Sequence, residues 1–313
     1  MRISVIIVTR NRKSDIRMIL GEFAKQTYPD MEIIVIDNES RDGTREMMSD
    51  EFPGIKYLWL PDNHDIRAIN IGIEMSDGDV IWRTDSDSHP EDGTEFERVV
   101  QILTKYPDID IIAAENIEVK SNFLPWNWYP IDVDKVNVPE NGYKSHYFPG
   151  TGAAIRRSVY DKIGGFWEYG MEEIDFATRA IRNGFNIRYF PNIRVLHYSS
   201  PFEKYKDFAW LNISRQMIRY NWKVFPFFRA LGRTTVIFWM QLLAGIMSRL
   251  SPLVLLEGIM QMHAASIHTI RCERVPVHKE LLYDITLGKS ILHDYKVFLK
   301  ASIKGKIKRL FRK

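Results

Sequence analysis

Strand-like and helix-like patterns alternate through the first 200 residues of this chain. The strand patterns are short, the first of them is an apolar β-branched run, and they lie at residues 3–8, 32–36, 55–60, 80–83, 109–114, 153–156 and 186–189. The helical patterns lie between them, at residues 14–26, 44–52, 66–75, 93–105, 158–163 and 173–183. Strands that alternate with helices form βαβ units, so the sequence predicts an α/β fold with a parallel sheet covered on both faces.

Charge divides the chain into two parts. Residues 1–200 contain 23 lysines and arginines and 33 acidic residues, whereas residues 201–313 contain 20 and 7. The acidic part is suited to holding a metal ion, and the basic part to meeting an anionic surface. We therefore expect two domains, at residues 1–200 and 201–313, and the pattern of the second is helical.

Cysteine usage and the N-terminus both bear on the cellular compartment. Cys272 is the only cysteine, which excludes an internal disulfide bond and a cysteine-based metal cluster and fits a reducing cytosol. The first nine residues have one short apolar run and no cleavage-like site, so we interpret them as a strand rather than a signal peptide. The expected location is cytoplasmic.

Polar residues follow each of the first four predicted strands. In a doubly wound sheet, ligands bind beyond the carboxyl ends of the strands, so these residues converge on one edge. A single cluster would be ordinary loop composition, whereas four at one edge predict a ligand site. The clusters are Thr9-Arg10-Asn11, Asp37, Asp62-Asn63 and Asp85-Ser86-Asp87.

The fourth cluster has the chemistry of a cation site. Asp85 and Asp87 are two residues apart across a turn, where their carboxylates can hold a hard divalent cation while phosphates and water complete the shell. The alternative is an ordinary acidic turn. An EF-hand is excluded because Pro90 stands where that loop requires glycine. Asp37 also has two possible roles: it contacts a base or ribose, or it starts a turn.

Three acidic residues, Glu172, Glu173 and Asp175, lie at the start of a predicted helix. The helix dipole favours negative charge there, so they are either capping residues or the carboxylates from which a general base is drawn. Residues 150–152 (GTG) lack the third glycine of a dinucleotide-binding fingerprint.

Several segments, in this order, resemble the family 2 glycosyltransferases of the GT-A fold, and together they span about residues 3–200. Residues 4–12 (SVIIVTRNR), 26–29 (QTYP) and 32–44 (EIIVIDNESRDGT) are similar to the family's SVIIPTYNR, QTYP and EIIVVDNGSxDGT. Residues 85–87 fall at its metal-binding DxD. Residues 150–157 (GTGAAIRR), 164–166 (GGF), 172–175 (EEID) and 195–197 (VLH) resemble its GAxxxxRR, GGF, EDxD and VxH segments.

The resemblance implies a GT-A fold, which is a Rossmann-like, doubly wound and mostly parallel sheet, followed here by an α-helical region. It also implies inverting transfer of a sugar from a nucleotide-diphosphate donor. By this resemblance Asp37 contacts the base, Thr9 and Arg10 line its pocket, and Asp85 faces the ribose. Asp87 would hold Mg²⁺ or Mn²⁺ against the diphosphate, whose negative charge the metal stabilises.

The resemblance also assigns the remaining site residues. Glu173 would take the proton from the acceptor hydroxyl, with Glu172 and Asp175 as second choices because the family usually has Asp at the position of Glu173. His197 would approach the metal or the diphosphate, with a buried core histidine as the alternative. Further substrate contacts are assigned to Asn63, Arg67, Asp85, Ser86, Gly152 and Glu172.

The last third of the chain predicts a membrane-associating region. Residues 234–248 are uncharged but too short to span a bilayer alone, so they form a membrane-seated surface or a buried or oligomer-forming helix pair. Residues 296–313 combine an apolar stripe at helical spacing with basic side chains, which is typical of a membrane-surface helix. The stripe consists of Leu299, Ile303, Ile307, Leu310 and Phe311. No nucleic-acid module is recognised, so nucleic acid is not an expected partner.

The expected function is transfer of a sugar to a glycan or lipid-linked acceptor in bacterial surface polysaccharide synthesis, at the inner face of the cell membrane. Aromatic residues at 123–129, with Tyr143 and Tyr147, either stack against the acceptor sugar or pack as an ordinary loop. Two other functions remain as alternatives. One is a nucleotidyltransferase of similar architecture, and the other is a non-catalytic glycan-assembly scaffold.

Overall fold

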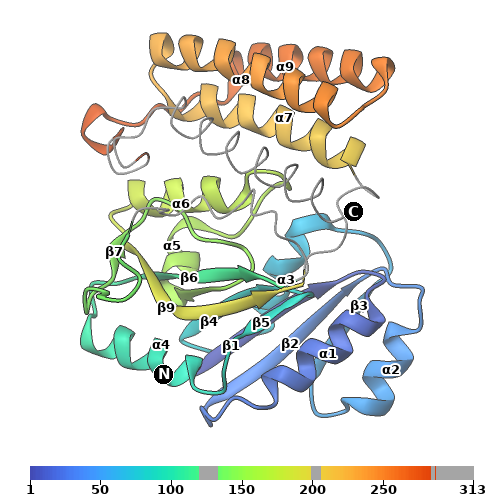
Figure 1. Ribbon diagram of the computed structural model, residues 1–313, viewed down its shortest axis with the longest axis vertical. Coiled ribbons are helices and arrows are strands. Elements are labelled where there is room, and N and C mark those ends of the chain that lie inside the picture. Colours follow the sequence, from blue (N-terminus) through green and yellow to red (C-terminus); the bar gives the residue numbers. More distant parts are fainter. Residues whose placement is uncertain (120–132, 199–205, 283–285, 287–313) are drawn as a thin grey trace, which may run out of the picture. The chain divides into compact units, whose positions relative to one another are not determined.

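The computed structural model describes residues 1–119, 133–198, 206–282 and 286 (Figure 1). The predicted aromatic loop at residues 123–129 and the predicted tail helix at residues 296–313 lie outside the described residues. The chain forms two compact units. The first consists of Met1–Trp167 and Phe176–Ser199, and the second of Glu168–Asp175 and Ser200–Lys313.

Four parallel strands build one half of the sheet in the first unit. β1 (Ile3–Thr9) pairs with β2 (Met31–Asn38) and with β4 (Val80–Asp85), and β2 pairs with β3 (Lys56–Leu60). β1 is an almost continuous apolar run because helices cover both faces of the sheet. Parallel pairing brings the carboxyl ends of all four strands, and therefore their polar loops, to one edge.

The other half of the sheet is mixed, and the strand order is β3-β2-β1-β4-β8-β6-β9-β5. β8 (Ala153–Arg156) runs antiparallel to both β4 and β6 (Ile111–Glu118). β9 (Ile187–His197) runs parallel to β6, and β5 (Ser88–Pro90) and β7 (Tyr143–Lys144) both run antiparallel to β9. The sequence did not predict β5 or β7, which are only two or three residues long.

Three strands continue beyond their predicted ends. β4 reaches Asp85, β6 reaches Glu118 and β9 reaches His197, whereas the apolar patterns ended at residues 83, 114 and 189. The reason is pairing, because the register places Glu118 beside His197 and the backbone hydrogen bonds of the ladder hold these polar residues in the sheet. A bulge between Ala114 and Glu115 accommodates the added length of β9.

Helices cover the two faces of the sheet. Alternate residues of β1 point to opposite faces, so Val5 and Ile7 join the core that includes residues of α1, α2 and α4, whereas Ile6 contacts Gly72 of α3. A Cβ on Gly72 would lie 2.6 Å from the side chain of Ile6. The helices are α1 (Lys13–Phe23), α2 (Thr44–Glu51), α3 (Ala68–Glu74), α4 (Glu95–Lys105), α5 (Arg157–Ile163) and α6 (Glu172–Arg182), with a short 3₁₀ turn η1 (Asp65–Arg67).

The second unit contains the helices α7 (Lys206–Val224), α8 (Phe227–Met247) and α9 (Pro252–Cys272), and the short 3₁₀ helix η3 (Lys279–Leu282). Trp210 of α7 is buried against two glycines, Gly245 of α8 and Gly258 of α9, which leave room for its indole ring. Its Nε1 donates a hydrogen bond to the carbonyl of Gln241 at 2.9 Å. One large side chain therefore fixes both helices on α7.

α8 is longer than its uncharged stretch indicated. It begins directly after Pro226 and contains 21 residues, because Arg233 is accommodated over the ring of Phe225, with its guanidinium 4.1 Å from the ring centre. By length and composition, α8 is the one described helix that is long and apolar enough to cross a membrane. The prediction that the segment is too short to span alone is therefore wrong on length, although length alone does not make a helix a membrane span.

The glycine contact predicts a stability difference between two matched variants. We expect Gly258→Ala to destabilise the second unit by ~1–3 kcal/mol, because the new Cβ would lie 2.1 Å from the indole ring of Trp210. Gly232→Ala in α8 is the control, since nothing lies within 4 Å of its Cβ position and alanine favours a helix by ~0.5–1 kcal/mol. Urea denaturation followed by circular dichroism measures both variants. Equal shifts in the same direction would contradict this packing.

Candidate active site

The loops that follow β1, β2 and β3 are joined to one another by hydrogen bonds. The backbone N–H of Asn11 donates to Ser40 Oγ, and the N–H of Arg41 donates to Asn11 Oδ1, both at 2.8 Å. Asn38 Nδ2 donates to Asn63 Oδ1 at 2.7 Å, which ties the second loop to the third. The sequence-predicted polar clusters after these three strands are therefore brought together at one edge of the sheet.

The backbone of these loops is also unusual. Asn11, Glu39 and Asp65 all have positive φ angles, at 52°, 73° and 50°. Non-glycine residues rarely adopt this conformation, which costs on the order of 1–3 kcal/mol and concentrates at functional sites. One such residue follows each of the first three strands. The loops are held in these conformations by the hydrogen bonds between them.

Asp37 and Thr9 differ in how their polar atoms are used. The buried carboxylate of Asp37 accepts hydrogen bonds from the Ser40 N–H at 2.8 Å and from the Tyr57 hydroxyl at 2.6 Å. Burial and this bond raise the pKa of Tyr57, so Tyr57 stays a donor. Thr9 is buried as well, but its Oγ1 has no hydrogen-bond partner among the described residues. A ligand hydrogen bond would satisfy this atom.

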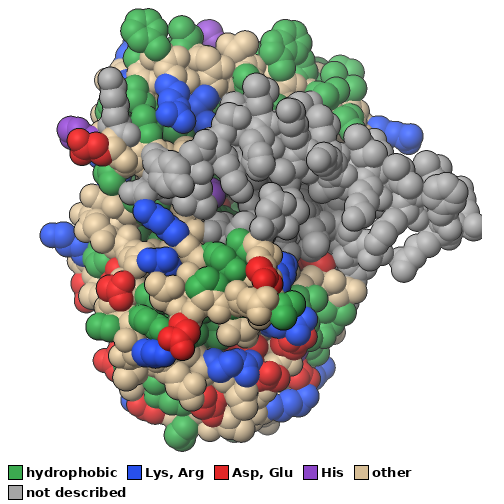
Figure 2. All heavy atoms as spheres, turned by 60° about the vertical axis from the view of Figure 1, so that its left-hand side comes forward, with side chains coloured by type: hydrophobic (Ala, Val, Ile, Leu, Met, Phe, Trp, Pro, Cys, Tyr) green, Lys and Arg blue, Asp and Glu red, His purple; other side chains and the backbone are tan. Residues whose placement is uncertain are grey.

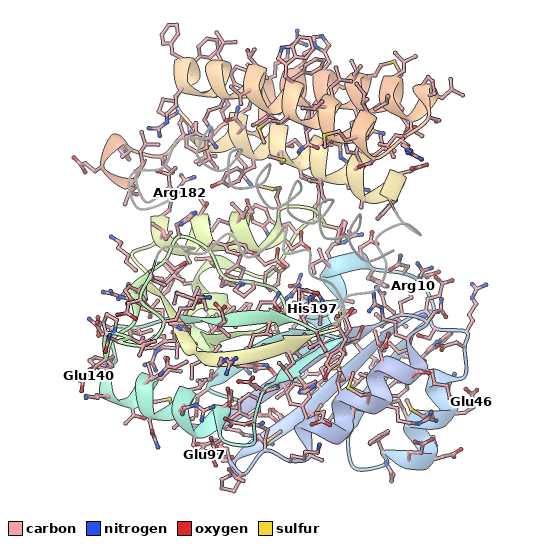
Figure 3. The ribbon with its side chains drawn as sticks, in the orientation of Figure 1. Arg10, Glu46, Glu97, Glu140, Arg182 and His197 are labelled. Carbon is pink, nitrogen blue, oxygen red and sulfur yellow. The ribbon has the colours of Figure 1, made fainter. Side chains whose placement is uncertain are left out.

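Arg10, which Figure 3 labels, lies at the same edge and forms an ion pair with Glu39 at 2.8 Å. That pair, together with Arg41, lowers the pKa of Glu39. Asn63 and Arg67 are exposed on the third loop. All three residues are accessible at the edge where the sequence predicted substrate contacts.

The Asp85-Ser86-Asp87 turn is held from beneath by a buried hydroxyl network. Ser88 Oγ lies 2.9 Å from both Thr84 Oγ1 and the carbonyl oxygen of Thr151, and it accepts from the Asp85 N–H at 3.1 Å. The N–H of Tyr198 donates to the carbonyl of Asp87 at 2.8 Å. These bonds fix the turn between β4 and β5 against the end of β9.

His197 is placed beside this turn by strand pairing. In the register of the sheet it lies between Ser88 of β5 and Glu118 of β6. Its Nδ1 forms an ion pair with the Glu118 carboxylate, and its Nε2 lies 3.3 Å from Asp87 Oδ1. His197 is labelled in Figure 3 at the end of β9. The imidazole therefore bridges two carboxylates, one at the end of β6 and one in the turn between β4 and β5.

Asp85, Asp87 and His197 form a group that fits a divalent metal. One ligand atom from each residue lies within 4.8 Å of the other two. The two carboxylates suit Mg²⁺ or Mn²⁺ in donor type. A carboxylate on the far nitrogen of a metal-binding histidine is a common supporting arrangement. Arg12 pairs with Asp87, and Arg83 Nη1 lies 3.0 Å from Asp85 Oδ1. These arginines balance the carboxylates when no metal is bound.

The same contacts shift two pKa values in opposite directions. Burial disfavours the charged form of Asp87, but its contacts with His197 and Arg12 outweigh burial and lower its pKa to about 2. Burial alone would lower the pKa of His197, yet Asp87 and Glu118 together raise it to about 10. In the metal-free protein at neutral pH, His197 is therefore a cation and Asp87 an anion.

Gly152 lies under this site and is explained by packing. It is buried, and a Cβ at this position would lie 2.4 Å from the side chain of Val195 and 3.3 Å from that of Trp82. The absence of a side chain lets the backbone just before β8 lie against Val195 of β9 and Trp82 of β4. The structure thus gives Gly152 a reason for being glycine that does not involve substrate. Ser86, in the turn itself, is also buried.

The three acids at the start of α6 belong to the second unit. Glu172 is buried and accepts a hydrogen bond from the Gly170 N–H, while Asp175 lies 3.3 Å from Lys223 of α7. Glu173 occupies the first turn of α6 between them. Its role as general base stays a prediction.

Two residues of the site were not assigned from sequence. Glu118 follows a strand pattern that ended at residue 114, so nothing local placed it beside His197, which is 79 positions later. Arg12 was within a matched motif, but its ion pair with Asp87 spans 75 positions. Only the pairing of strands distant in sequence shows that both residues support the acidic turn.

The family of this chain follows from comparison with known proteins. The sequence model of glycosyl transferase family 2 matches residues 4–164, a segment that contains the first three loops, the Asp85-Ser86-Asp87 turn and Glu118. The chain belongs to glycosyl transferase family 2. The resemblance stated from the sequence motifs is confirmed, as is the GT-A type of fold.

Curated relatives and a solved structure are similar to this family 2 chain. The probable glycosyltransferase YdaM of Bacillus subtilis is 27% identical over 205 residues, which are 61% of this chain and 49% of YdaM. The chain thus matches about half the length of that relative. The O-antigen chain rhamnosyltransferase RfbN of Salmonella typhimurium is 26% identical over 66% of this chain and 70% of its own length. The mannosyltransferase PcManGT of Pyrobaculum calidifontis, solved with GDP-Man and Mn²⁺, is 17% identical, covers 100% of this chain and 88% of its own, and has a TM-score of 0.54.

Proposed function

We propose that this family 2 protein is an inverting glycosyltransferase that moves a sugar from a nucleotide-diphosphate donor to an acceptor hydroxyl. The observation that carries the proposal is the Asp85–Asp87–His197 group at the carboxyl edge of the parallel strands. It is supported by PcManGT, a protein of similar fold whose structure holds GDP-Man and Mn²⁺. Mg²⁺ or Mn²⁺ is the proposed cofactor.

The described residues divide the work of binding the donor. The base and ribose are proposed to contact the edge formed by Asp37, Thr9 and Arg10, with Asn63 and Arg67 on the neighbouring loop. Asp85, Asp87 and His197 would hold the metal, which stabilises the negative charge that develops on the leaving diphosphate. Glu118 orients the imidazole of His197 from the side away from Asp87.

Transfer to the acceptor requires a base on the side of the anomeric carbon opposite the leaving diphosphate. Glu173 is the proposed base, with Glu172 and Asp175 as the other carboxylates of the same helix turn. The base removes the proton of the acceptor hydroxyl. At the same time the hydroxyl oxygen forms a bond to the anomeric carbon, and the bond between that carbon and the diphosphate breaks. A single in-line displacement of this kind inverts the anomeric configuration.

The acceptor and the location are proposed from the relatives and the helical unit. RfbN acts in O-antigen chain synthesis by its name, which favours a glycan or lipid-linked acceptor in bacterial surface polysaccharide synthesis. We propose a cytoplasmic protein bound peripherally to the inner face of the cell membrane through its basic C-terminal part. Association of two copies through the same helices is the alternative use of that surface.

A screen of nucleotide sugars by thermal denaturation tests the proposed function. A ligand that binds only the folded protein raises its melting temperature, by an amount equivalent to ~2.7 kcal/mol at 100 times its Kd. We expect one nucleotide sugar to raise the melting temperature in the presence of Mn²⁺ and to do so much less with EDTA. Stabilisation by nucleoside triphosphates alone would indicate a nucleotidyltransferase. Donor binding with neither hydrolysis nor transfer would indicate a scaffold.

The charge on His197 predicts how metal affinity depends on pH. Because its pKa is raised to about 10, His197 must release a proton to coordinate a metal at neutral pH. We expect Mn²⁺ affinity to rise by about tenfold per pH unit between pH 6.5 and 8.5, measured by isothermal titration. The stability of the metal-free protein depends on pH in the opposite direction. The ion pairs of His197 stabilise the fold fully below pH 6.5, and this contribution is lost as the pH rises through about 10.

His197→Gln is the control for this pH dependence. The amide has no proton to release, so the variant should bind Mn²⁺ more weakly and with a much flatter pH profile. If the Mn²⁺ affinity of the unaltered protein does not change with pH, His197 is not a ligand of the metal.

A further inference from the structure

The hairpin formed by α8 and α9 presents apolar side chains to solvent along its whole length. On α8 these side chains recur every three or four positions, with one interruption, and a similar spacing holds on α9. Phe228, Trp239 and Leu253 are 85%, 63% and 79% exposed. The α8–α9 apolar face consists of these three residues with Leu231, Leu243, Ile246, Leu256, Met260 and Ile267. Figure 2 shows hydrophobic side chains projecting from the helices of this unit.

The apolar face lies on the side of the hairpin away from α7. The buried residues of the two helices include Gly245 and Gly258, which contact Trp210 of α7. Polar contacts hold α8 to α7 on the same inner side, because Asn221 Nδ2 donates to the Ala230 carbonyl at 2.8 Å and to Thr234 Oγ1 at 2.9 Å. These contacts to α7 come from residues outside the α8–α9 apolar face.

The charges around the apolar face have one predominant sign. Residues 227–272 contain four arginines and a single acidic residue, Glu257. Arg233 turns inward to Asn221, at 3.1 Å, whereas Arg229, Arg249 and Arg271 are exposed. Arg249 lies in the connection between the helices, and the other two lie near the opposite end of the hairpin. Cations thus stand at both ends of an apolar stripe.

We propose that the α8–α9 apolar face lies in the plane of an anionic lipid bilayer, with its apolar side chains inserted and its arginines at the phosphate groups. This deepens the membrane location proposed above and rests on it. Arginine side chains reach phosphates from such a position while their aliphatic parts stay in contact with apolar groups. Trp239 has the amphipathic ring that is favoured at the boundary between lipid and water.

Charge favours lipid over a second copy as the occupant of this face. Two copies packed through the same face would bring arginine-bearing ends together, and Glu257 is the one carboxylate within the hairpin that could offset them. Anionic phosphates complement all three exposed arginines. The hairpin is also held flat rather than across the bilayer, since α7, to which α8 is fixed, carries Arg215, Arg219 and Lys223.

The experiment places a fluorescent probe on the face itself. In a Cys272→Ser background, Leu253→Cys is labelled with an environment-sensitive dye, and the full chain is mixed with phosphatidylcholine vesicles with or without phosphatidylglycerol. We expect a blue shift with anionic vesicles and quenching by lipids brominated on their acyl chains. Val136→Cys, exposed on the first unit, is the matched control and should show neither change.

Two sets of substitutions separate the apolar and charged contributions. Phe228→Ser/Trp239→Ser/Leu253→Ser should weaken vesicle binding by more than about tenfold, whereas Val136→Ser should not. Arg229→Gln/Arg249→Gln/Arg271→Gln should reduce the preference for anionic vesicles by about fivefold for each arginine that reaches a phosphate. Circular dichroism melting curves check that the variants remain folded, and salt should weaken binding only in part because insertion is not screened.

The outcomes also distinguish this proposal from the membrane location in general. Vesicle binding without a change in probe fluorescence would place the membrane contact elsewhere, for example on residues 296–313. It would overturn the role of the hairpin but leave the proposed membrane location intact. A blue shift without vesicles that depends on protein concentration, together with dimers in sedimentation, would show that a second copy covers the face. A monomer that neither binds any vesicle nor shows a change in probe fluorescence would overturn both the role of the hairpin and the membrane location.

Discussion

Asp87→Ala is expected to abolish metal-dependent donor binding and to reduce sugar transfer by about 10²–10³-fold or more, the range seen when one group that stabilises a leaving charge is removed. Asp87 is the residue on which the site converges, because its carboxylate contacts both His197 and Arg12. Without it, Asp85 and His197 are the two residues of the group that remain to hold the metal. Isothermal titration with Mn²⁺ and a transfer assay with the identified donor measure the two losses.

A matched control keeps this result specific. Asp62→Asn removes an exposed carboxylate from the loop after β3, at the same edge of the sheet, and should leave Mn²⁺ binding nearly unchanged. The fold of Asp87→Ala is checked by its melting curve, since the hydroxyl network of Thr84, Ser88 and Thr151 remains to hold the turn. Full activity in the presence of EDTA, or in the Asp87 variant, would refute the metal role.

Glu173→Gln is expected to lower turnover by about 10²–10⁴-fold while the affinity for the donor stays nearly constant. The amide keeps the size of the side chain but cannot accept the proton of the acceptor hydroxyl. Donor binding should be insensitive, since the proposed donor site consists of residues at the sheet edge rather than of α6. Steady-state kinetics give turnover, and thermal stabilisation by the donor gives binding.

Two neighbouring variants decide which carboxylate is the base. Glu172→Gln removes an acid whose carboxylate already accepts a hydrogen bond from Gly170, and Asp175→Asn removes the partner of Lys223. We expect both to affect stability more than turnover. Normal turnover in Glu173→Gln, combined with an inactive Glu172 or Asp175 variant, would transfer the role of base to that residue.

Much of the fold was predictable because its signals are local. An apolar run such as residues 3–8 is buried on both faces of a sheet whatever else the chain does, and a turn such as Asp42-Gly43-Thr44 precedes a helix for reasons within a few residues. The Asp85-Ser86-Asp87 turn was equally legible, since two carboxylates two residues apart are close in any conformation. Its position at the edge of the sheet followed from parallel pairing of the strands before it.

The tertiary structure alone decided what surrounds that turn. His197 and Arg12 contact Asp87 from two other segments, and Glu118 contacts the far side of His197. The register of β5, β6 and β9, rather than any local pattern, places Glu118 and His197 side by side at the turn. The ends of those strands were missed because ladder hydrogen bonds can hold polar residues such as Glu118 in a sheet. The outward face of α8 also depended on tertiary packing. The uncharged stretch at residues 234–248 shows no polar side in the sequence, and packing against α7 determines which of its side chains are buried and which, like Trp239, remain exposed.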